Sequence, residues 1–351
     1  MKRIGNLYEK ICDIENLRLV HKQDRRGKSF YTEVKLIDEN EDEYLHRLQD
    51  MLIHKTYHTS KYEVFEKNED KKIRKIYKPP YFPDRICQWA IIQVIEPYLM
   101  RTLTDDTYSA LPGRGVERAR RKMVRALKTD PKNAVWCLKI DISKYYPNIN
   151  IEKLKLKYRQ LFKGNDLLWL LDEILDSNPD TGVPIGNYIS QYSGNIYLSD
   201  FDRRIKEVYH IKHYFRHMDD MVFFSSSKEE LQALIKEITK YLADEHDLKV
   251  KDSWSLFRAE ARGIDFVGYA FKHGSIRLRK SIAHSIKKTS SKISWRINND
   301  MELNRHLYFS SNSLKGWIKH SHANWLKIKY FDIVEDYVIE YHNKYLVNKD
   351  K

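Results

Sequence analysis

The chain contains Tyr214-Phe215-Arg216-His217-Met218-Asp219-Asp220-Met221-Val222-Phe223-Phe224, in which two adjacent carboxylates stand between two apolar, aromatic-rich runs. Such runs favour β-strands, so the stretch predicts a β-hairpin with acids at its tip. Neighbouring residues of a strand point to opposite faces, so only one of Asp219 and Asp220 should face a given site squarely. A divalent metal ion would explain the crowded charge, and a polar turn is the alternative.

A third carboxylate would favour the metal, and one follows a second strand-like run. Val135–Ile140 has the apolar character of a buried strand, and Asp141 stands where that strand leaves the sheet. A lone Asp at a strand end is usually a cap or turn residue. Its functional interpretation therefore depends on whether it lies beside Asp219 in space.

Three further segments could face a ligand. Residues 181–195 form a loop with Gly182 and Gly186, whose small size lets a backbone approach a ligand closely, although a simple loop before a core helix is the alternative. Arg74 lies in a predicted strand pair over 62–77, with a polar turn at 67–70. Arg85 lies near the start of a helix that we expect from Asp84. Both arginines could bind a triphosphate, or could simply be exposed.

Composition indicates a globular protein of two or three lobes with a polyanionic partner. The 351 residues are 42% hydrophobic, and 63 Lys and Arg against 49 Asp and Glu give a net charge of +14. The sequence contains no apolar run long enough to span a membrane and no signal peptide, so we expect a cytoplasmic protein without a membrane partner. Cys12, Cys87 and Cys137 form no C-x-x-C pair, which predicts reduced core residues.

Basic residues gather in two predicted helical regions that suit a nucleic-acid backbone. The first begins with the turn at 112–116, which contains Arg114, and continues as a helix that carries Arg118 and Arg121. The second is a small helical lobe from Lys272 onward, in which we expect Lys280, Lys287 and Lys288 to bind nucleic acid. We expect the lobe's tryptophans to form its core; they are Trp295, Trp317 and Trp325.

The remaining pattern predicts mainly helices over residues 1–70, an amphipathic helix over 228–242, and strands at 248–251 and 263–269. Taken in order, the strand-end acid, the glycine-bearing loop and the two-acid hairpin resemble the palm of a reverse transcriptase. The resemblance implies an α+β fold of the right-hand polymerase type, with fingers, an antiparallel-sheet palm and a basic α-helical thumb. Its expected parts are an N-terminal extension (1–60), fingers (61–134), palm (135–271) and thumb (272–351).

The resemblance also implies an RNA-directed DNA polymerase that uses two Mg²⁺ ions, with Mn²⁺ as an alternative. The implied metal ligands are Asp141, Asp219, Asp220 and the backbone carbonyl of Ile142. The implied nucleotide-binding residues are Arg74, Arg85, Tyr146, Ile185, Gly186 and Gln191. Tyr146 matches the aromatic residue that blocks a ribose 2′-hydroxyl, and an ordinary core aromatic is the alternative. His217 departs from the family, which usually has Tyr at this position.

Within the family, Ile185-Gly186-Asn187-Tyr188-Ile189-Ser190-Gln191 is similar to the pattern of diversity-generating retroelements. That similarity implies error-prone copying opposite template adenines, with template RNA, cDNA, dNTPs and a small basic accessory variability protein as partners. Ile185 could instead simply pack beneath the loop. A reverse transcriptase of a phage-defence, retron or group II intron-like system is the alternative within the enzyme class. A nucleic-acid-binding protein on an inactive palm is the alternative outside it.

Overall fold

The computed structural model describes residues 2–69 and 72–345. The chain divides into two compact units. The first comprises residues 1–118, 139–223 and 229–255, and the second comprises 119–138, 224–228 and 256–351. Helices combine with antiparallel sheets, which confirms the predicted α+β class.

The first unit begins with the predicted helices. They are α1 (Tyr8–Cys12), α2 (Ile14–Asp24), α3 (Thr32–Glu39) and α4 (Glu41–Ile53). Asp13 caps α2, because its carboxylate accepts a hydrogen bond of 3.0 Å from the amide of Glu15. The apolar positions that predicted these helices are buried, with Leu17 and Leu48 fully inaccessible to solvent.

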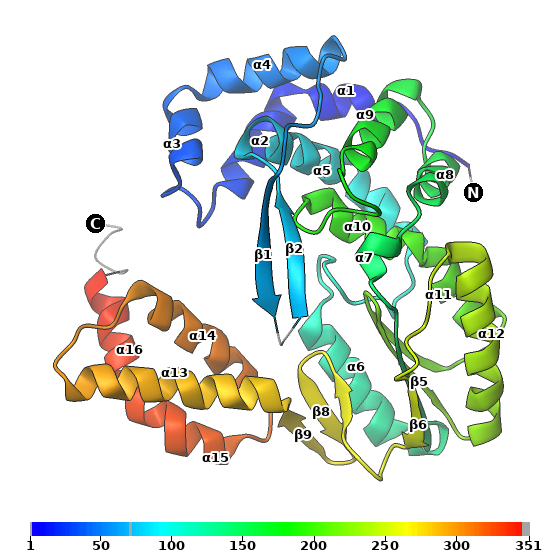
Figure 1. Ribbon diagram of the computed structural model, residues 1–351, viewed down its shortest axis with the longest axis vertical. Helices are drawn as coiled ribbons and strands as arrows, with labels where there is room; N and C mark the ends of the chain where they lie inside the picture. The colour runs from blue at the N-terminus through cyan, green and yellow to red at the C-terminus, as the bar shows by residue number, and fades with distance from the viewer. Residues whose placement is uncertain (1, 70–71, 346–351) are drawn as a thin grey trace. The chain divides into compact units, whose positions relative to one another are not determined.

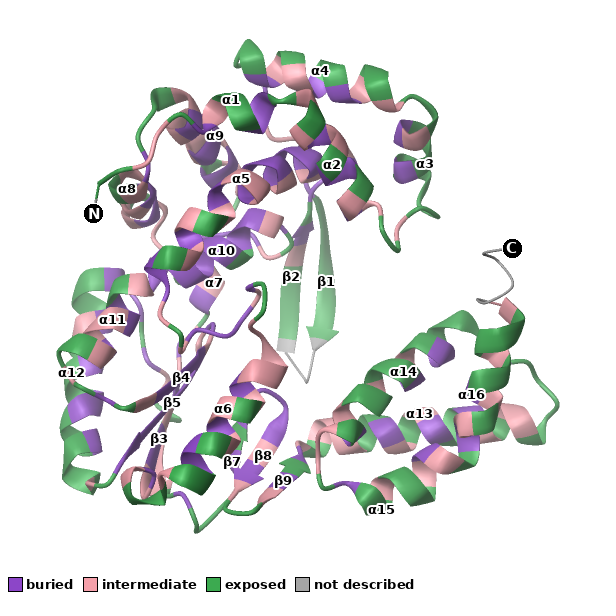
Figure 2. Ribbon diagram, turned by 180° about the vertical axis from the view of Figure 1, so that it is seen from behind, coloured by how far each residue is buried: buried purple, intermediate pink, exposed green. Residues whose placement is uncertain are grey.

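A two-stranded antiparallel ribbon follows, formed by β1 (Glu63–Glu69) and β2 (Lys72–Lys78). It agrees with the predicted strand pair, although β1 continues through residues 67–69, where the sequence predicted a turn. Residue 70, the last of that predicted turn, lies outside the described residues. Figure 2 shows both strands as largely exposed, and Ile73 is 67% exposed.

A buried helical layer supports the ribbon. A π-helical turn, η1 (Tyr81–Arg85), leads into α5 (Ile86–Thr102), which starts two residues after the predicted point. Because α5 is apolar on most of its surface, it is buried along much of its length. The other helices of this unit before the hairpin are α7 (Tyr145–Asn148), α8 (Ile151–Leu161), α9 (Asn165–Asp176), α10 (Tyr188–Tyr197) and α11 (Ser199–Glu207).

The four-stranded sheet has the order β4-β5-β3-β6. Its strands are β3 (Trp136–Asp141), β4 (His213–His217), β5 (Asp220–Ser225) and β6 (Ser255–Arg258). The hairpin β4–β5 and the strand ending at Asp141 agree with the predictions. The predicted strand at 248–251 is reduced to one bridge between Val250 and Ile142, whereas β6 had no predicted counterpart.

Helix α12 (Lys228–His246) lies alongside the sheet together with α11 (Figure 1). It is the predicted amphipathic helix extended by four residues, and it buries Leu231, Leu234 and Ile238. The basic region after residue 115 is also helical, as α6 (Val116–Thr129), and it ends at the short 3-10 turn η2 (Pro131–Asn133). Both helices therefore follow from their apolar periodicity.

The second unit contains a three-stranded sheet, β7 (Ile264–Phe266), β8 (Tyr269–Lys272) and β9 (Ser275–Leu278). The sequence predicted one strand over 263–269, and this prediction was wrong, because Val267 and Gly268 form a two-residue turn between β7 and β8. Both turn residues have positive φ angles, of 42° and 86°. A tight hairpin turn with two such residues matches the twist of the flanking strands.

The predicted C-terminal helical lobe is present. It consists of α13 (Lys280–Asn298), α14 (Arg305–Lys319), α15 (Asn324–Leu326), the π-helical turn η3 (Lys327–Phe331) and α16 (Asp332–Tyr345). Its core is aliphatic with one tyrosine: Ile293, Leu303, Leu307, Tyr308, Val334 and Val338.

The prediction that tryptophans form this core was wrong. Trp295 and Trp325 are 57% and 58% exposed. Trp317 is half-buried and packs on Tyr269, with the ring centroids 5.1 Å apart, and its ring lies where a β-carbon on Gly268 would be. The smaller aliphatic residues fill the helix contacts instead.

All three cysteines, Cys12, Cys87 and Cys137, are buried and form no disulfide. Burial raises the pKa of the Cys12 thiol to about 11, and it raises the pKa of Cys87 as well. Across residues 2–69 and 72–345, none of the helices combines the length and the apolar character needed to cross a bilayer.

Candidate active site

The hairpin between β4 and β5 has an unusual backbone at its tip. Met218, which precedes the two acids, has a φ angle of +56°, in the left-handed region that side chains other than glycine rarely adopt. Its side chain is buried, and its sulfur accepts a hydrogen bond of 3.5 Å from the Tyr146 hydroxyl. The turn is thus fixed from inside the protein, which sets the direction of the acids that follow.

Asp141 lies next to this tip. The amide of Ile142 donates a hydrogen bond of 3.2 Å to the carbonyl oxygen of Asp219, so the end of β3 is tied to the turn. Burial, and then the negative charge of Asp141, raise the pKa of the Asp219 carboxyl. The third carboxylate therefore lies beside the hairpin, as the functional interpretation of Asp141 required.

Asp220 has a different environment. It is the first residue of β5, and its carboxylate pairs with the ammonium of Lys139 at 3.3 Å. Burial is the main cause that raises its pKa to about 6, while Lys139 acts in the opposite direction. Asp219 and Asp220 consequently have different surroundings, because Asp219 lies in the turn and Asp220 begins β5.

A second lysine contacts the site from the segment after α12. The ammonium of Lys251 forms an ion pair with the carboxylate of Asp141. The amide of Lys251 also donates a hydrogen bond of 2.9 Å to the Asp141 carbonyl oxygen. The positive charge of Lys251 lowers the pKa of Asp219, against the larger effect of burial.

The predicted nucleotide-binding arginines have different surroundings. The charge of Arg74, on β2, lowers the pKa of both Asp219 and Tyr146, which places Arg74 near the carboxylates. Arg85 instead makes two hydrogen bonds, of 2.6 and 3.0 Å, to the fully buried carboxylate of Asp24. The charge of Arg74 therefore acts on Asp219, whereas the Arg85 guanidinium is committed to a structural pair with Asp24.

The glycine-bearing loop packs against both β2 and the site. The amide of Tyr77 donates a hydrogen bond of 2.8 Å to the carbonyl oxygen of Ile185. Gly186 has a φ angle of 132°, and a β-carbon there would overlap the Tyr77 carbonyl. Gly182 has a φ angle of 73°, and a β-carbon there would overlap the Tyr146 carbonyl. Both positions require glycine because another backbone approaches them.

Helix α10 carries the rest of this loop motif. The amide of its first residue, Tyr188, donates a hydrogen bond of 2.9 Å to the side-chain oxygen of Gln88. The Tyr188 ring stacks on Trp89, with 4.3 Å between the ring centroids. Gln191 is exposed, whereas Ile185 is half-buried. The loop and the start of α10 are thus held by α5 and β2.

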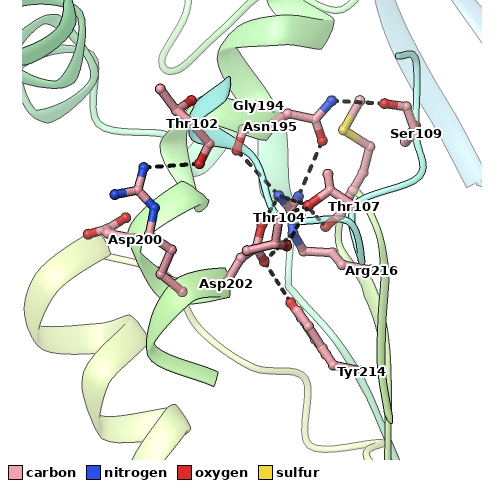
Figure 3. A network of polar contacts seen from close by, with 12 residues as sticks. Thr102, Thr104, Thr107, Ser109, Gly194, Asn195, Asp200, Asp202, Tyr214 and Arg216 are labelled. Carbon is pink, nitrogen blue, oxygen red and sulfur yellow. Dashed lines mark hydrogen bonds and ion pairs between the residues drawn. The ribbon is translucent and has the colours of Figure 1, made fainter. Parts of the chain in front are cut away.

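A buried polar network beneath the hairpin was missed by the sequence analysis (Figure 3). Arg216, on β4, is fully buried and pairs with the fully buried Asp202 of α11 at 2.6 Å. Its guanidinium also donates to the Met218 carbonyl oxygen at 3.3 Å and to the Asn195 side chain at 3.4 Å. Tyr214 donates to Asp202 at 2.8 Å. The sequence feature that could have revealed this network is an arginine within an apolar strand, because a buried arginine needs a charged or hydrogen-bonding partner.

The hydrogen bonds of Arg216 connect this network to the site. Arg216 reaches the carbonyl of Met218, the residue with the left-handed backbone, and it reaches α10 through Asn195. The network therefore joins the tip of the hairpin to two helices.

The residues predicted to bind nucleic acid differ in how they are placed. Arg114 is partly buried and donates hydrogen bonds to the carbonyl oxygens of Thr104 and Thr107, so it holds its own loop. Arg118 pairs with Asp105 at 2.9 Å. Exposed positions on helices are occupied by Arg121 of α6 and by Lys280 and Lys288 of α13.

Lys287 of α13 is half-buried and lies over two aromatic rings of the second unit. Its ammonium is 5.6 Å from the ring centroid of Trp325 and 5.6 Å from that of Tyr330. This geometry is a cation–π arrangement. The structure therefore gives Lys287 an intramolecular role that the sequence did not predict.

Among the described residues, no group of three or more His, Cys, Asp and Glu side chains is arranged to hold a metal ion by itself. Mg²⁺ in nucleotide-handling sites is usually bound by one or two carboxylates together with substrate phosphates and water. Asp141 and Asp219 supply such a pair of hard oxygen ligands, since the charge of Asp141 raises the pKa of Asp219 and the two residues therefore lie close together. The donor set fits a divalent ion that is completed by substrate.

Comparison with known proteins gives one family and a set of similar structures. The family described as "Reverse transcriptase (RNA-dependent DNA polymerase)" matches residues 65–271. No curated protein matches the chain. An apo telomerase from Candida tropicalis is 13% identical, with 72% of this chain and 53% of that chain covered and a TM-score of 0.51.

A second telomerase structure from Candida tropicalis, in complex with a TWJ fragment of telomeric RNA, is 14% identical. The match covers 85% of this chain and 58% of that chain, with a TM-score of 0.50. The chain thus spans less than two thirds of the length of these structures. At such identity the likeness concerns the fold, and it agrees with a right-hand polymerase architecture.

Proposed function

The chain belongs to the reverse transcriptase (RNA-dependent DNA polymerase) family, and from this membership we propose that it copies an RNA template into cDNA. The observation that carries the proposal is the meeting of Asp141 and Asp219 at the ends of two neighbouring strands. Its substrates would be dNTPs, a template RNA and a growing DNA strand. The same pair of acids weakens the alternative of an inactive palm that only binds nucleic acid.

Asp141 and Asp219 would bind two Mg²⁺ ions, or Mn²⁺, with the carbonyl of Ile142 and the carboxylate of Asp220 completing the protein's contribution. Such ions, when bound, assist the primer 3′-hydroxyl as nucleophile and stabilise the leaving pyrophosphate. Asp219 must be ionised to take part, although burial and Asp141 favour its protonated form. Lys251 and Arg74 favour the ionised carboxylate and so assist it.

Three residues, Arg74, Tyr146 and Gly186, would bind and orient the incoming nucleotide. Arg74 would contact its triphosphate, because guanidinium groups suit phosphate oxygens. Tyr146 would lie against the ribose and disfavour a 2′-hydroxyl; its hydrogen bond to Met218 supports a fixed ring position. Gly186 would let the backbone of the loop approach the substrate. Gln191 is proposed as a further contact, while Arg85 is better explained by its pair with Asp24.

The division into an N-terminal extension (1–60), fingers (61–134), palm (135–271) and thumb (272–351) is part of the proposal. Exposed basic residues on α6 and α13 support nucleic-acid binding through Arg121, Lys280 and Lys288. Arg114, Arg118 and Lys287, which the sequence also predicted to bind nucleic acid, make intramolecular contacts. A cytoplasmic location remains a prediction.

Replacement of Asp219 by Ala tests the polymerase proposal. We expect the variant to lose Mg²⁺-dependent incorporation of dNTPs on a primed RNA template. Asp252→Ala is the matched control, because the Asp252 side chain is 92% exposed and its pair with Lys249 is long, at 3.7 Å. Incorporation by Asp219→Ala at the level of the control would contradict the proposal.

We further propose that the enzyme belongs to the diversity-generating type and misincorporates opposite template adenines. The supporting observation is the apolar, half-buried Ile185, whose carbonyl is held by Tyr77. An apolar side chain beside the nucleotide would offer no hydrogen bond to place it, which loosens selection. A small basic accessory variability protein would be a partner.

Sequencing of cDNA made from a defined RNA tests this second proposal. Errors should concentrate at adenines for the natural chain, and Ile185→Gln should bring the frequency at adenines toward that at other bases. A uniform spectrum for the natural chain would contradict it and favour a defence, retron or group II intron-like role. A repeat pair near the gene, one copy serving as template, would support diversification.

A further inference from the structure

Lys251 is held beside Asp141 by its backbone as well as by its charge. The amide of Lys251 donates to the Asp141 carbonyl at 2.9 Å, and the amide of Ser143 donates to the Lys249 carbonyl at 2.8 Å. These two bonds flank the bridge between Ile142 and Val250. The ammonium of Lys251 is therefore delivered to the Asp141 carboxylate by a fixed piece of antiparallel pairing.

The acids of the site are already balanced by basic side chains of the same unit. Lys251 pairs with Asp141, Lys139 pairs with Asp220, and the charge of Arg74 acts on Asp219. A carboxylate that is paired with an ammonium attracts a further cation less strongly, because the second positive charge meets repulsion from the first. Charge balance of this kind raises the concentration of divalent ion needed to fill the site.

The ion pair between Lys251 and Asp141 is also accessible to solvent, so the Lys251 ammonium can move into water. The side chain of Lys251 is 29% exposed and that of Asp141 is 35% exposed, so water can receive the ammonium. A divalent ion binds carboxylate through the same oxygen lone pairs that the ammonium uses. The two cations thus compete for one carboxylate.

We propose that Lys251 is a displaceable internal counter-ion of Asp141, which competes with the divalent cation and sets the cation concentration that the site requires. The inference rests on the proposed function in taking Asp141 as a metal ligand. It makes Lys251 a positioning residue, which holds Asp141 in place until a metal ion binds.

The size of the effect follows from the charges. A unit positive charge about 5 Å from a divalent ion, in surroundings close to water, weakens its binding by roughly tenfold. Removal of the Lys251 charge should therefore tighten divalent binding by about that factor. Lys251→Arg keeps the charge and should leave the affinity within about threefold of the natural value.

Titration of the full chain with Mn²⁺ alone, in the absence of nucleotide and nucleic acid, tests this competition. Electron paramagnetic resonance measures the concentration of unbound Mn²⁺. The binding that is lost in Asp141→Asn is assigned to the site that depends on the Asp141 carboxylate. We expect about tenfold tighter Mn²⁺ binding at that site for Lys251→Gln. Lys249→Gln is the matched control, because it also removes one positive charge and lies two residues from Lys251. The Lys249 side chain is 72% exposed and pairs with Asp252 instead of Asp141.

Equal Mn²⁺ affinity of Lys251→Gln and Lys249→Gln would overturn the inference. Weaker Mn²⁺ binding by Lys251→Gln than by the natural chain would also overturn it, provided that the two proteins unfold at the same temperature. If Lys251→Gln unfolds at a lower temperature than the natural chain, Lys251→Met is measured in its place. We expect about tenfold tighter Mn²⁺ binding for Lys251→Met as well, and unchanged binding would overturn the inference. Failure of the polymerase proposal is read separately, from incorporation by Asp219→Ala. The Mn²⁺ measurement needs no turnover.

Discussion

Replacement of Asp220 by Asn is expected to make the metal-free protein more stable at neutral pH while lowering its polymerase activity. The carboxyl of Asp220 has a pKa of about 6, raised chiefly by burial, and its side chain is only 21% exposed. A carboxyl with a raised pKa binds its proton more tightly in the folded protein than in the unfolded chain. Its contribution to stability is therefore complete below about pH 4 and lost as the pH rises through about 6.

The magnitude follows from the difference between about 6 and the unfolded value of about 3.9. Two pKa units correspond to about 3 kcal/mol, which the ionised carboxylate costs the folded state at pH 8. Asparagine has the shape of the protonated acid and carries no charge, so the substitution should recover up to that amount. At pH 5 the gain should fall to about half, because part of the natural Asp220 is then protonated.

Urea denaturation of both proteins at pH 8 and pH 5, in buffer with a chelator, measures this difference in the free energy of unfolding. The chelator is required because a bound divalent ion would stabilise the ionised acid. Asp252→Asn serves as the control, since the exposed Asp252 should change stability by less than about 0.5 kcal/mol at either pH. An Asp220→Asn protein that is less stable at pH 8, or whose gain is the same at pH 5, would refute the role assigned to burial.

Three other substitutions have definite expected outcomes. Gly186→Ala should lower the free energy of unfolding by about 2 kcal/mol or more in urea denaturation, because its methyl group would overlap the Tyr77 carbonyl in a backbone conformation unsuited to alanine. Arg216→Met should cost about 3–5 kcal/mol by the same measurement, since it leaves the buried Asp202 carboxylate without its charged partner. Tyr146→Ala should reduce the preference for dNTPs over rNTPs in competitive incorporation, with the rate on dNTPs less affected.

Each of these three substitutions has a control variant that separates the stated cause from a general loss of stability. Gly113→Ala places a methyl group at a position with positive φ and open space, so it should cost only about 1 kcal/mol. Arg216→Met combined with Asp202→Leu should be more stable than Arg216→Met alone, because no buried charge remains. Tyr146→Phe should retain the sugar preference, and its loss would show that the hydroxyl, rather than the ring, carries the discrimination.

The fold and the central acids were predictable because their signals are local. Two apolar, aromatic-rich runs on either side of Asp219 and Asp220 indicated a hairpin, and an apolar run ending at Asp141 indicated a strand. The presence of three acids in a fixed order pointed to one site, and the structure places Asp141 beside Asp219.

Long-range partners could not be predicted in the same way. Nothing near Arg85 in sequence indicates that Asp24, far upstream, would take its guanidinium, nor does the sequence order show that Lys251 reaches Asp141. Arg216 and Asp202 lie closer together, but their pairing depends on how α11 packs against β4. Exposure of Trp325 likewise follows from which side chains fill the helical core, which hydrophobicity alone does not decide.

Because all three thiols are buried, their rates of chemical modification can measure how often the surrounding structure opens. Cys12 and Cys87 belong to the N-terminal helices, and Cys137 belongs to the strand that ends at Asp141. Because burial keeps the Cys12 and Cys87 thiols protonated and leaves Cys87 and Cys137 fully inaccessible and Cys12 6% exposed, an alkylating reagent modifies them mainly when the surrounding structure opens. The labelling rate at Cys137 would therefore measure the opening of strand β3, separately from that of the helices.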